Sequence, residues 1–321
     1  MTPIGWTLSV LALVAVGGLA AALVYGVFRS RSAPATTPSG SMALQGSTAV
    51  ARAASYAVLA GMLAVAVAFS PIGVAALVAA IGLVGLWEWA QLADLPIHHR
   101  VVMLGADLVL IAAVHAQGAT AADWLVGGIV LVGALWPIVR ADTQRAMRDL
   151  GSAAIGFVFV AVTLVHAVAL VGEHGEAGAV LFAGLALGCA GSDVGAFLVG
   201  RRFGRSKLAP QLSPNKTRAG LVGNLLGAAV GLLPLAPALA IALPSAGIPA
   251  WFGLALVPIV AVGAVWGDLF KSAAKREAGV KDFGSWLPGF GGILDRVDSL
   301  LMTLPLAYWS LRILAAAGLV A

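Results

Sequence analysis

The chain is a succession of long apolar segments separated by short polar loops. A helix needs roughly 17 to 25 apolar residues to cross the hydrocarbon core of a bilayer, and each segment is close to that length. We therefore predict an all-α, polytopic integral membrane protein with about ten transmembrane helices. The expected spans are 4–28, 55–70, 71–93, 101–117, 122–139, 151–172, 178–200, 219–243, 250–269 and 298–319.

The composition argues against a soluble domain. Hydrophobic residues make up 60% of the chain and charged residues 10%, with a mean hydropathy of +0.99, whereas about a quarter of the residues in soluble domains are charged. The single Cys189 excludes an internal disulfide framework. The five histidines share no ligand spacing, which excludes a metal centre of the Cys/His type.

Basic residues predict the orientation. Every Lys and Arg except Arg312 lies in one set of alternate loops, and the opposite loops carry none. Short loops rich in Lys and Arg stay in the cytoplasm, so we expect the basic loops there and both termini outside. The sequence pI of about 9.8 then reflects loop topology and anionic headgroups, and nucleic-acid binding is the poorer explanation.

Three regions are expected along the chain. Residues 1–28 lack a basic start and are followed by Arg29 and Arg31, which favours an extra N-terminal membrane anchor over a cleaved signal peptide. Residues 29–54, rich in Ser, Thr, Pro, Ala and Gly, predict a flexible cytoplasmic linker. Residues 55–321 form the membrane-embedded domain.

Charge is concentrated between Gly267 and Asp298, about a tenth of the length, which holds ten of the 33 charged residues. A charge in or beside a bilayer needs a partner, water or a functional role, so this cluster marks the chemistry. Polar residues recur there at i, i+3, i+4, i+7 and i+8, which places them on one stripe of a helix. They are Asp268, Lys271, Ser272, Lys275 and Arg276.

A glycine-rich turn and two carboxylates follow this stripe. The glycines of Leu287–Gly292 permit close approach of the backbone to a phosphate, and the next helix start would offer free N–H groups. Asp295 and Asp298 fall on neighbouring positions of one helix face and suit Mg²⁺ bound jointly with substrate phosphates. The alternative is a solvated helix N-terminus enriched in Asp.

A second polar set runs from Asp193 into a basic loop. Asp193 lies about two turns inside the expected membrane boundary, so its carboxylate needs a cationic or metal partner. The loop alternates cations with Gly and Pro and continues as Ser213-Pro-Asn-Lys-Thr217, which can hold several phosphate oxygens. A loop that only sets topology, followed by an ordinary helix start, is equally consistent. Its cations include Arg201, Arg202, Arg205, Lys207 and Lys216.

These residues resemble a known family. The run from Ser272 to Asp298 closely resembles the signature of phosphatidate cytidylyltransferases, and the run from Asp193 to Gly223 resembles that family's second conserved region. Glu88-Trp89 also looks like a family feature, and the resemblance covers roughly residues 55–320. This chain departs from the pattern at Phe290, where the family usually has His, and at Arg218-Ala219, where many members carry Trp-Glu or Trp-Gln.

The resemblance implies an enzyme of phospholipid biosynthesis that makes CDP-diacylglycerol and pyrophosphate from CTP and phosphatidate. The expected cofactor is Mg²⁺, alone or with a second, monovalent cation. The catalytic loops are expected to face the cytoplasm of a bacterial inner membrane. No nucleic-acid partner is expected, and a homodimer is compatible with the resemblance. We expect catalysis from Asp268, Lys275, Arg276, Lys281, Asp282 and Arg296, substrate binding from Arg201, Lys207, Ser213, Lys216, Thr217, Gly291 and Gly292, and metal ligation from Asp193, Asp268, Asp295 and Asp298. Glu88 and Asp107 are expected at about the same depth in the membrane as these acids, and we treat both as structural.

Three other functions fit the same features less well. One is a related CTP-dependent enzyme acting on another lipid, and another is a paralogue of low activity. The third is a transporter, which polar residues at membrane depth would also suit. Against transport, the carboxylates gather near one face and do not line a path across the membrane.

Overall fold

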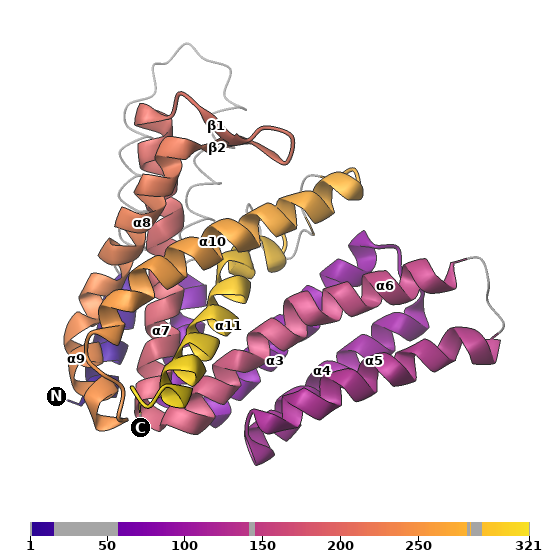
Figure 1. Cartoon of the computed structure of the whole chain (residues 1–321), viewed down its shortest axis with the longest axis horizontal. Helices are drawn as coiled ribbons and strands as arrows, with labels where there is room; N and C mark the ends of the chain where they lie inside the picture. The colour runs from indigo at the N-terminus through magenta and orange to yellow at the C-terminus, as the bar shows by residue number, and fades with distance from the viewer. Residues whose placement is uncertain (1, 16–56, 141–144, 281–282, 284–290, 321) are drawn as a thin grey trace, which may run out of the picture.

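The computed structural model describes residues 2–15, 57–140, 145–280, 283 and 291–320, with the backbone alone for 134–140. The described part is a helical bundle with one small β-hairpin (Figure 1). In chain order the labelled elements are α3 (Ile72–Leu92), α4 (Ile97–Gln117), α5 (Thr120–Arg140), α6 (Ala146–Phe157), the π-helical turn η1 (Val158–Val162), α7 (Thr163–Phe203), β1 (Lys207–Ala209), β2 (Ser213–Thr217), α8 (Arg218–Leu232), the 3₁₀ turn η2 (Leu233–Leu235), α9 (Ala236–Ser245), α10 (Phe252–Glu277) and α11 (Leu294–Ala316).

The predicted all-α membrane fold is confirmed, whereas the predicted count of about ten spans is not supported. Six helical stretches of the described residues are long and apolar enough to cross a membrane. Two expected spans, 151–172 and 178–200, lie within one of these, Ala146–Phe203, on the two sides of a sharp bend at Gly175. Three others correspond to shorter apolar helices in the described residues, Pro3–Ala15, Ala57–Ala68 and Thr120–Gly133. The expected linker 29–54 and half of the expected anchor lie outside the described residues.

A sharp bend at Gly175 divides α7 into two arms. Gly175 has φ 53° and ψ −122°, a left-handed conformation that glycine adopts without a Cβ penalty. The arms approach so closely beside the bend that a Cβ on Gly178 would collide with the carbonyl oxygen of Leu170. The first arm continues from α6, and the second leads to the β-hairpin (Figure 1).

Glycines let the second arm of α7 pack directly against α8. A Cβ on Gly195 would collide with the carbonyl oxygen of Gly223, and one on Gly227 with that of Gly191. Small residues spaced four apart on both helices permit this backbone approach, which is a usual way for helices to associate in lipid. Asp193 lies on α7 between the two contacts made by Gly191 and Gly195, so this packing fixes its position along the bundle.

Helices α10 and α11 also cross at glycines. A Cβ on Gly263 would lie 2.7 Å from the Cα of Thr303, and a Cβ on Gly267 would collide with the carbonyl oxygen of Asp298. Each glycine is therefore needed for the crossing distance. Because Asp268 follows Gly267, the crossing brings the charged stripe of α10 against the first turns of α11.

The β-hairpin connects α7 to α8. Its strands are antiparallel, with Lys207 opposite Thr217 and Ala209 opposite Ser213. The Thr217 hydroxyl accepts the backbone N–H of Gly220 at 3.1 Å and so caps α8. The Arg276 Nε donates to the carbonyl oxygen of Leu212 at 3.4 Å, which links the hairpin to the end of α10.

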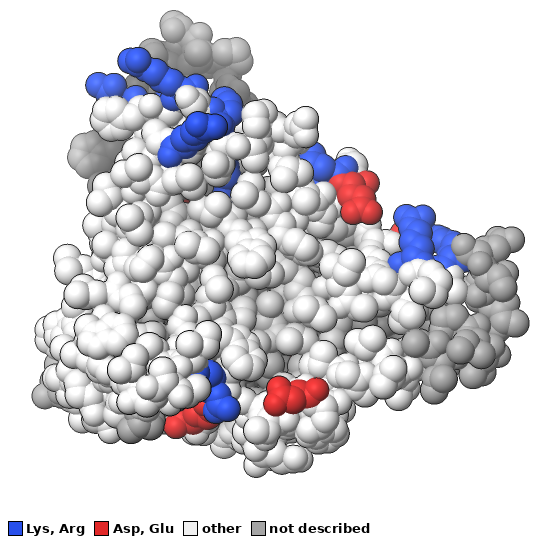
Figure 2. All heavy atoms as spheres, in the orientation of Figure 1, with Lys and Arg blue, Asp and Glu red and all other residues white. Residues whose placement is uncertain are grey.

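Charge is distributed unevenly along the bundle. Basic side chains on the visible face lie mostly toward the hairpin end, above a broad uncharged belt (Figure 2). Both chain termini are marked at the other end (Figure 1). There the N–H of Ile4 donates to Glu176 at 2.9 Å, and Arg312 lies 3.8 Å from Glu173. The first and last described helices therefore meet the bend of α7, away from the hairpin.

Replacing Gly227 by Ala should lower the melting temperature in detergent, because overpacking a tight contact costs about 1–3 kcal/mol. Gly105→Ala, in α4, is the matched control, since a Cβ there meets nothing within 4 Å. Ala is the better helix former by about 1 kcal/mol, so the control should melt at or above the wild-type temperature. Equal melting temperatures for Gly227→Ala and the wild type would contradict the packing described for α7 and α8.

Candidate active site

Three carboxylates and three lysines form a connected group at the hairpin end, which we call the acid–lysine network. Its carboxylates come from α10 and α11 and its ammonium groups from β2 and α10. Lys216 Nζ lies 2.7 Å from Asp268 Oδ2, and Lys275 Nζ lies 2.9 Å from Asp295 Oδ1. The members are Asp268, Asp295, Asp298, Lys216, Lys271 and Lys275.

Lys271 joins the three acids of this network. Its Nζ contacts Asp298 Oδ2 directly and lies 3.3 Å from Asp268 Oδ1 and 3.8 Å from Asp295 Oδ1. It also donates to the backbone carbonyl of Asp295 at 3.4 Å. Lys271, Asp295 and Asp298 are all buried, and buried ions of one sign are tolerated only when ions of the other sign are close.

Asp295 organises the segment that leads into α11. Its Oδ2 accepts the backbone N–H of Phe283 at 3.0 Å and that of Gly292 at 3.3 Å. One carboxylate thus holds two backbone positions and, through Oδ1, Lys275 as well. Just before Gly292, Gly291 has φ 82°, a value that favours glycine.

Glu88 caps the start of α11 from α3. Its two carboxylate oxygens accept the N–H groups of Ile293 and Leu294, each at 2.9 Å. A Cβ on Gly292 would lie 2.5 Å from Glu88 Oε2, so glycine is required for this approach. The prediction that this helix start offers free N–H groups to a phosphate is wrong for Gly292, Ile293 and Leu294, because carboxylates of the protein already accept them.

An aromatic cluster holds the Glu88-Trp89 segment. The Trp89 ring stacks on Phe270 of α10, with centroids 6.3 Å apart, and on Phe283 at 6.2 Å. Its Nε1 donates to the carbonyl oxygen of Ser152 at 3.0 Å. Because Trp89 is fixed on several sides, the neighbouring Glu88 is held at the start of α11.

Asp193 lies beside the network but is less enclosed. It is exposed in the structure, and its Oδ1 accepts the hydroxyl of Ser299 at 3.2 Å. Its carboxylate is close enough to those of Asp268 and Asp298 to be repelled by both. The structure thus brings α7, α10 and α11 together at one group of acids.

The remaining predicted site residues fall into three groups. Arg201, Lys207 and Arg276 are exposed, while Ser213 and Arg296 are half-buried and Thr217 caps α8. Gly291 and Gly292 lie directly before α11. Lys281, Asp282 and the distinctive Phe290 lie outside the described residues.

The described side chains do not make a metal cage by themselves. No group of three or more His, Cys, Asp and Glu residues in the described ranges is placed to hold a metal ion. Mg²⁺, however, usually binds through one or two carboxylates together with substrate phosphates. Asp193, exposed beside Asp298, supplies oxygen ligands that suit a metal ion bound in that way.

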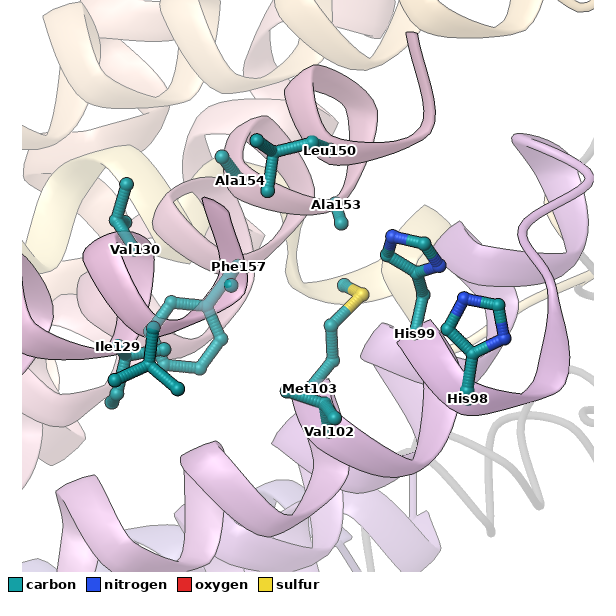
Figure 3. A pocket seen from close by; sticks show the side chains of 12 residues that line it. His98, His99, Val102, Met103, Ile129, Val130, Leu150, Ala153, Ala154 and Phe157 are labelled. Atoms are coloured by element: carbon teal, nitrogen blue, oxygen red, sulfur yellow. The ribbon is translucent and has the colours of Figure 1, made fainter. Parts of the chain in front are cut away.

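Another cavity, among α4, α5 and α6, has a different chemistry. It has a volume of about 140 Å³ and mainly apolar walls that include Met103, Leu150 and Phe157, with His98 and His99 at one end (Figure 3). Apolar walls suit hydrocarbon and leave the charges of a triphosphate without partners. The acid–lysine network is therefore the better site for phosphate chemistry.

Sequence reasoning missed two connections in this site. It treated Glu88 as structural without finding its partners, and it placed Lys271 on the charged stripe without assigning it a role. The Glu88 contacts join residues 205 and 206 positions apart. The i, i+3 spacing of Asp268 and Lys271 was the available signal for the ion pair that they form.

The fold and the site together define a polytopic membrane protein with a buried network of carboxylates and lysines at one end of its helices. The model of the cytidylyltransferase family matches residues 50–314, and the chain belongs to that family.

Individual relatives carry more specific names. The chain is 30% identical over 203 residues to the phosphatidate cytidylyltransferase of Mycobacterium leprae, covering 59% of this chain and 62% of the relative. It is 43% identical to that of Bacillus subtilis, over 38% of this chain and 44% of the relative. It is 32% identical to the uncharacterized protein YnbB of Escherichia coli, over 59% of each. The matches to these three relatives thus span less than two thirds of each relative's length.

Replacing Glu88 by Ala should destabilise the start of α11, because each buried N–H left without an acceptor costs about 1–3 kcal/mol. We expect a lower melting temperature in detergent and faster hydrogen exchange at Ile293 and Leu294. Glu277→Ala, at the exposed end of α10, is the control and should change neither. Unchanged exchange at both amides in Glu88→Ala would contradict the capping role.

Proposed function

We propose that this chain transfers a cytidylyl group from CTP to phosphatidate and releases pyrophosphate. The observation that carries the proposal is the acid–lysine network beside an exposed basic hairpin, in a chain of the cytidylyltransferase family. The printed names of the relatives from M. leprae and B. subtilis support phosphatidate as the acceptor.

The reaction requires an attack by phosphate on phosphate. A phosphate oxygen of phosphatidate attacks the α-phosphorus of CTP, and the bond from that phosphorus to the oxygen bridging to the β-phosphate breaks. Pyrophosphate leaves with the bonding electron pair, and CDP-diacylglycerol remains in the membrane. Because the second pKa of a phosphate monoester is about 6, the nucleophile is already largely ionised at neutral pH. The site therefore needs no strong general base.

The protein has to position two anions that repel each other. We assign contacts with nucleotide phosphates to Lys275 and Arg276 on α10 and to Lys216 on β2. The exposed Arg201 and Lys207 lie at the hairpin end, where they can guide CTP or the phosphatidate headgroup. Charge neutralisation and alignment of the attacking and leaving oxygens supply most of the rate enhancement in reactions of this class.

Mg²⁺ is proposed to enter with the nucleotide. Asp193 and Asp298, with Asp268, are the acids that would hold it, and when bound it would neutralise charge on the triphosphate. Asp295, proposed from the sequence as a further ligand, is turned toward Lys275 and two backbone N–H groups. We therefore give Asp295 a positioning role in the proposed site.

The orientation in the membrane follows from the same chemistry. We propose that the hairpin end faces the cytoplasm, because CTP is water-soluble and the basic loops favour that side. The phosphatidate headgroup would meet CTP at the inner-leaflet surface, with its acyl chains remaining in lipid. The chain termini would then lie on the outer side.

The wild-type protein, reconstituted with phosphatidate and Mg²⁺, should incorporate label from the α-phosphate of CTP into a lipid and release label from the γ-phosphate as pyrophosphate. Asp193→Asn should lower turnover by about 100-fold, the scale for losing one electrostatic stabiliser. The control is Asp123→Asn, whose residue lines a cavity with Tyr308 and Arg312 and should leave turnover unchanged. Thin-layer chromatography of the lipid product measures all three proteins.

Two results would count against the proposal. Folded wild-type protein that forms no labelled lipid from CTP and phosphatidate would overturn the activity. Normal turnover in Asp193→Asn would leave the activity standing but remove Asp193 from the site.

A further inference from the structure

Lys271 lies where a bound cation would be expected in a cluster of carboxylates. Its ammonium group contacts an oxygen of Asp298 and is within 4 Å of oxygens of Asp268 and Asp295. Only 9% of its side chain is exposed. The three acids come from two helices, so this one amine joins α10 to α11.

The network is formally neutral without any added ion. Three carboxylates, those of Asp268, Asp295 and Asp298, face the ammonium groups of three lysines. Lys216 and Lys275 each pair with a single acid of the network. Lys271 is the member that pairs with all three.

An ammonium group and a divalent ion compete for the same carboxylate oxygens. A divalent ion that entered the cluster would have to displace Lys271 Nζ, and a displaced buried ammonium group would lose its ion pairs. A metal ion that arrives with a triphosphate brings negative charge that can receive the displaced amine. Nucleotide therefore favours an exchange of the amine for the metal ion.

We propose that Lys271 is a built-in cation of this site, which holds the carboxylate cluster together in the resting protein and excludes a divalent ion until nucleotide binds. The proposal rests on the proposed function only for the identity of that nucleotide. It gives Lys271 a positioning role that controls when metal can bind.

Binding of Mn²⁺ to the purified protein without nucleotide tests this proposal, with free Mn²⁺ measured by electron paramagnetic resonance. The wild type should bind Mn²⁺ weakly, and Lys271→Gln should bind it at least tenfold more tightly. Lys271→Arg keeps the charge and should bind as weakly as the wild type. Lys275→Gln, the matched control, also removes one positive charge but pairs with Asp295 alone, so its affinity should change by less than threefold.

A second measurement covers the case in which Lys271→Gln folds poorly. Thermal unfolding in chelator and in Mn²⁺ should show that the ion stabilises Lys271→Gln much more than the wild type, because a ligand of the folded state raises its stability. Tight binding by the wild type, equal affinities of Lys271→Gln and the wild type, or equal tightening in Lys275→Gln would overturn the proposal. So would a Lys271→Gln protein that stays unfolded at every Mn²⁺ concentration.

These outcomes are separate from the proposed activity. The binding assay contains neither CTP nor phosphatidate, so a protein that transfers no cytidylyl group can still show the predicted Mn²⁺ affinities. Conversely, an active wild type with tight Mn²⁺ binding would retain the proposed function and lose the role given to Lys271.

Discussion

The ion pairs of Lys271 with the acids of α10 and α11 are the interaction on which the rest of the site depends. Buried charges are costly unless they are paired, and breaking a buried pair typically costs about 3–5 kcal/mol. The pairing is possible because α10 and α11 approach at Gly263 and Gly267, where side chains would keep them apart. The same crossing places the acids beside Asp193 of α7. The crossing of α10 and α11 therefore determines both the packing of these helices and the arrangement of the acids.

Carboxylates of the protein also hold the start of α11. Glu88 accepts two of its backbone N–H groups, and Asp295 accepts those of Gly292 and Phe283. A helix start used in this way is no longer open to a phosphate. In the proposed function, nucleotide phosphates would therefore be bound mainly by side-chain cations such as Lys216, Lys275 and Arg276.

Much of the fold could be read from the sequence, because the length of an apolar segment and the spacing of charges are local properties. The helical class, the stripe from Asp268 to Arg276 and the glycine at the start of α11 are of this kind. Local signals did not show that the helix continues from the expected span 151–172 into 178–200 with only a bend at Gly175 between them. Nor could periodicity reveal that Glu88 reaches Leu294, because nothing in either segment specifies its partner. The roles of individual site residues remain predictions.

A structure of the protein with a non-hydrolysable CTP analogue and Mg²⁺ tests the central claim most directly. The account predicts that the triphosphate lies at the hairpin end, in contact with Lys275, Arg276 or Lys216, and that the metal ion lies between its phosphates and Asp193 or Asp298. A triphosphate in the cavity beside His98 and His99, or at the end near Arg312, would contradict the account.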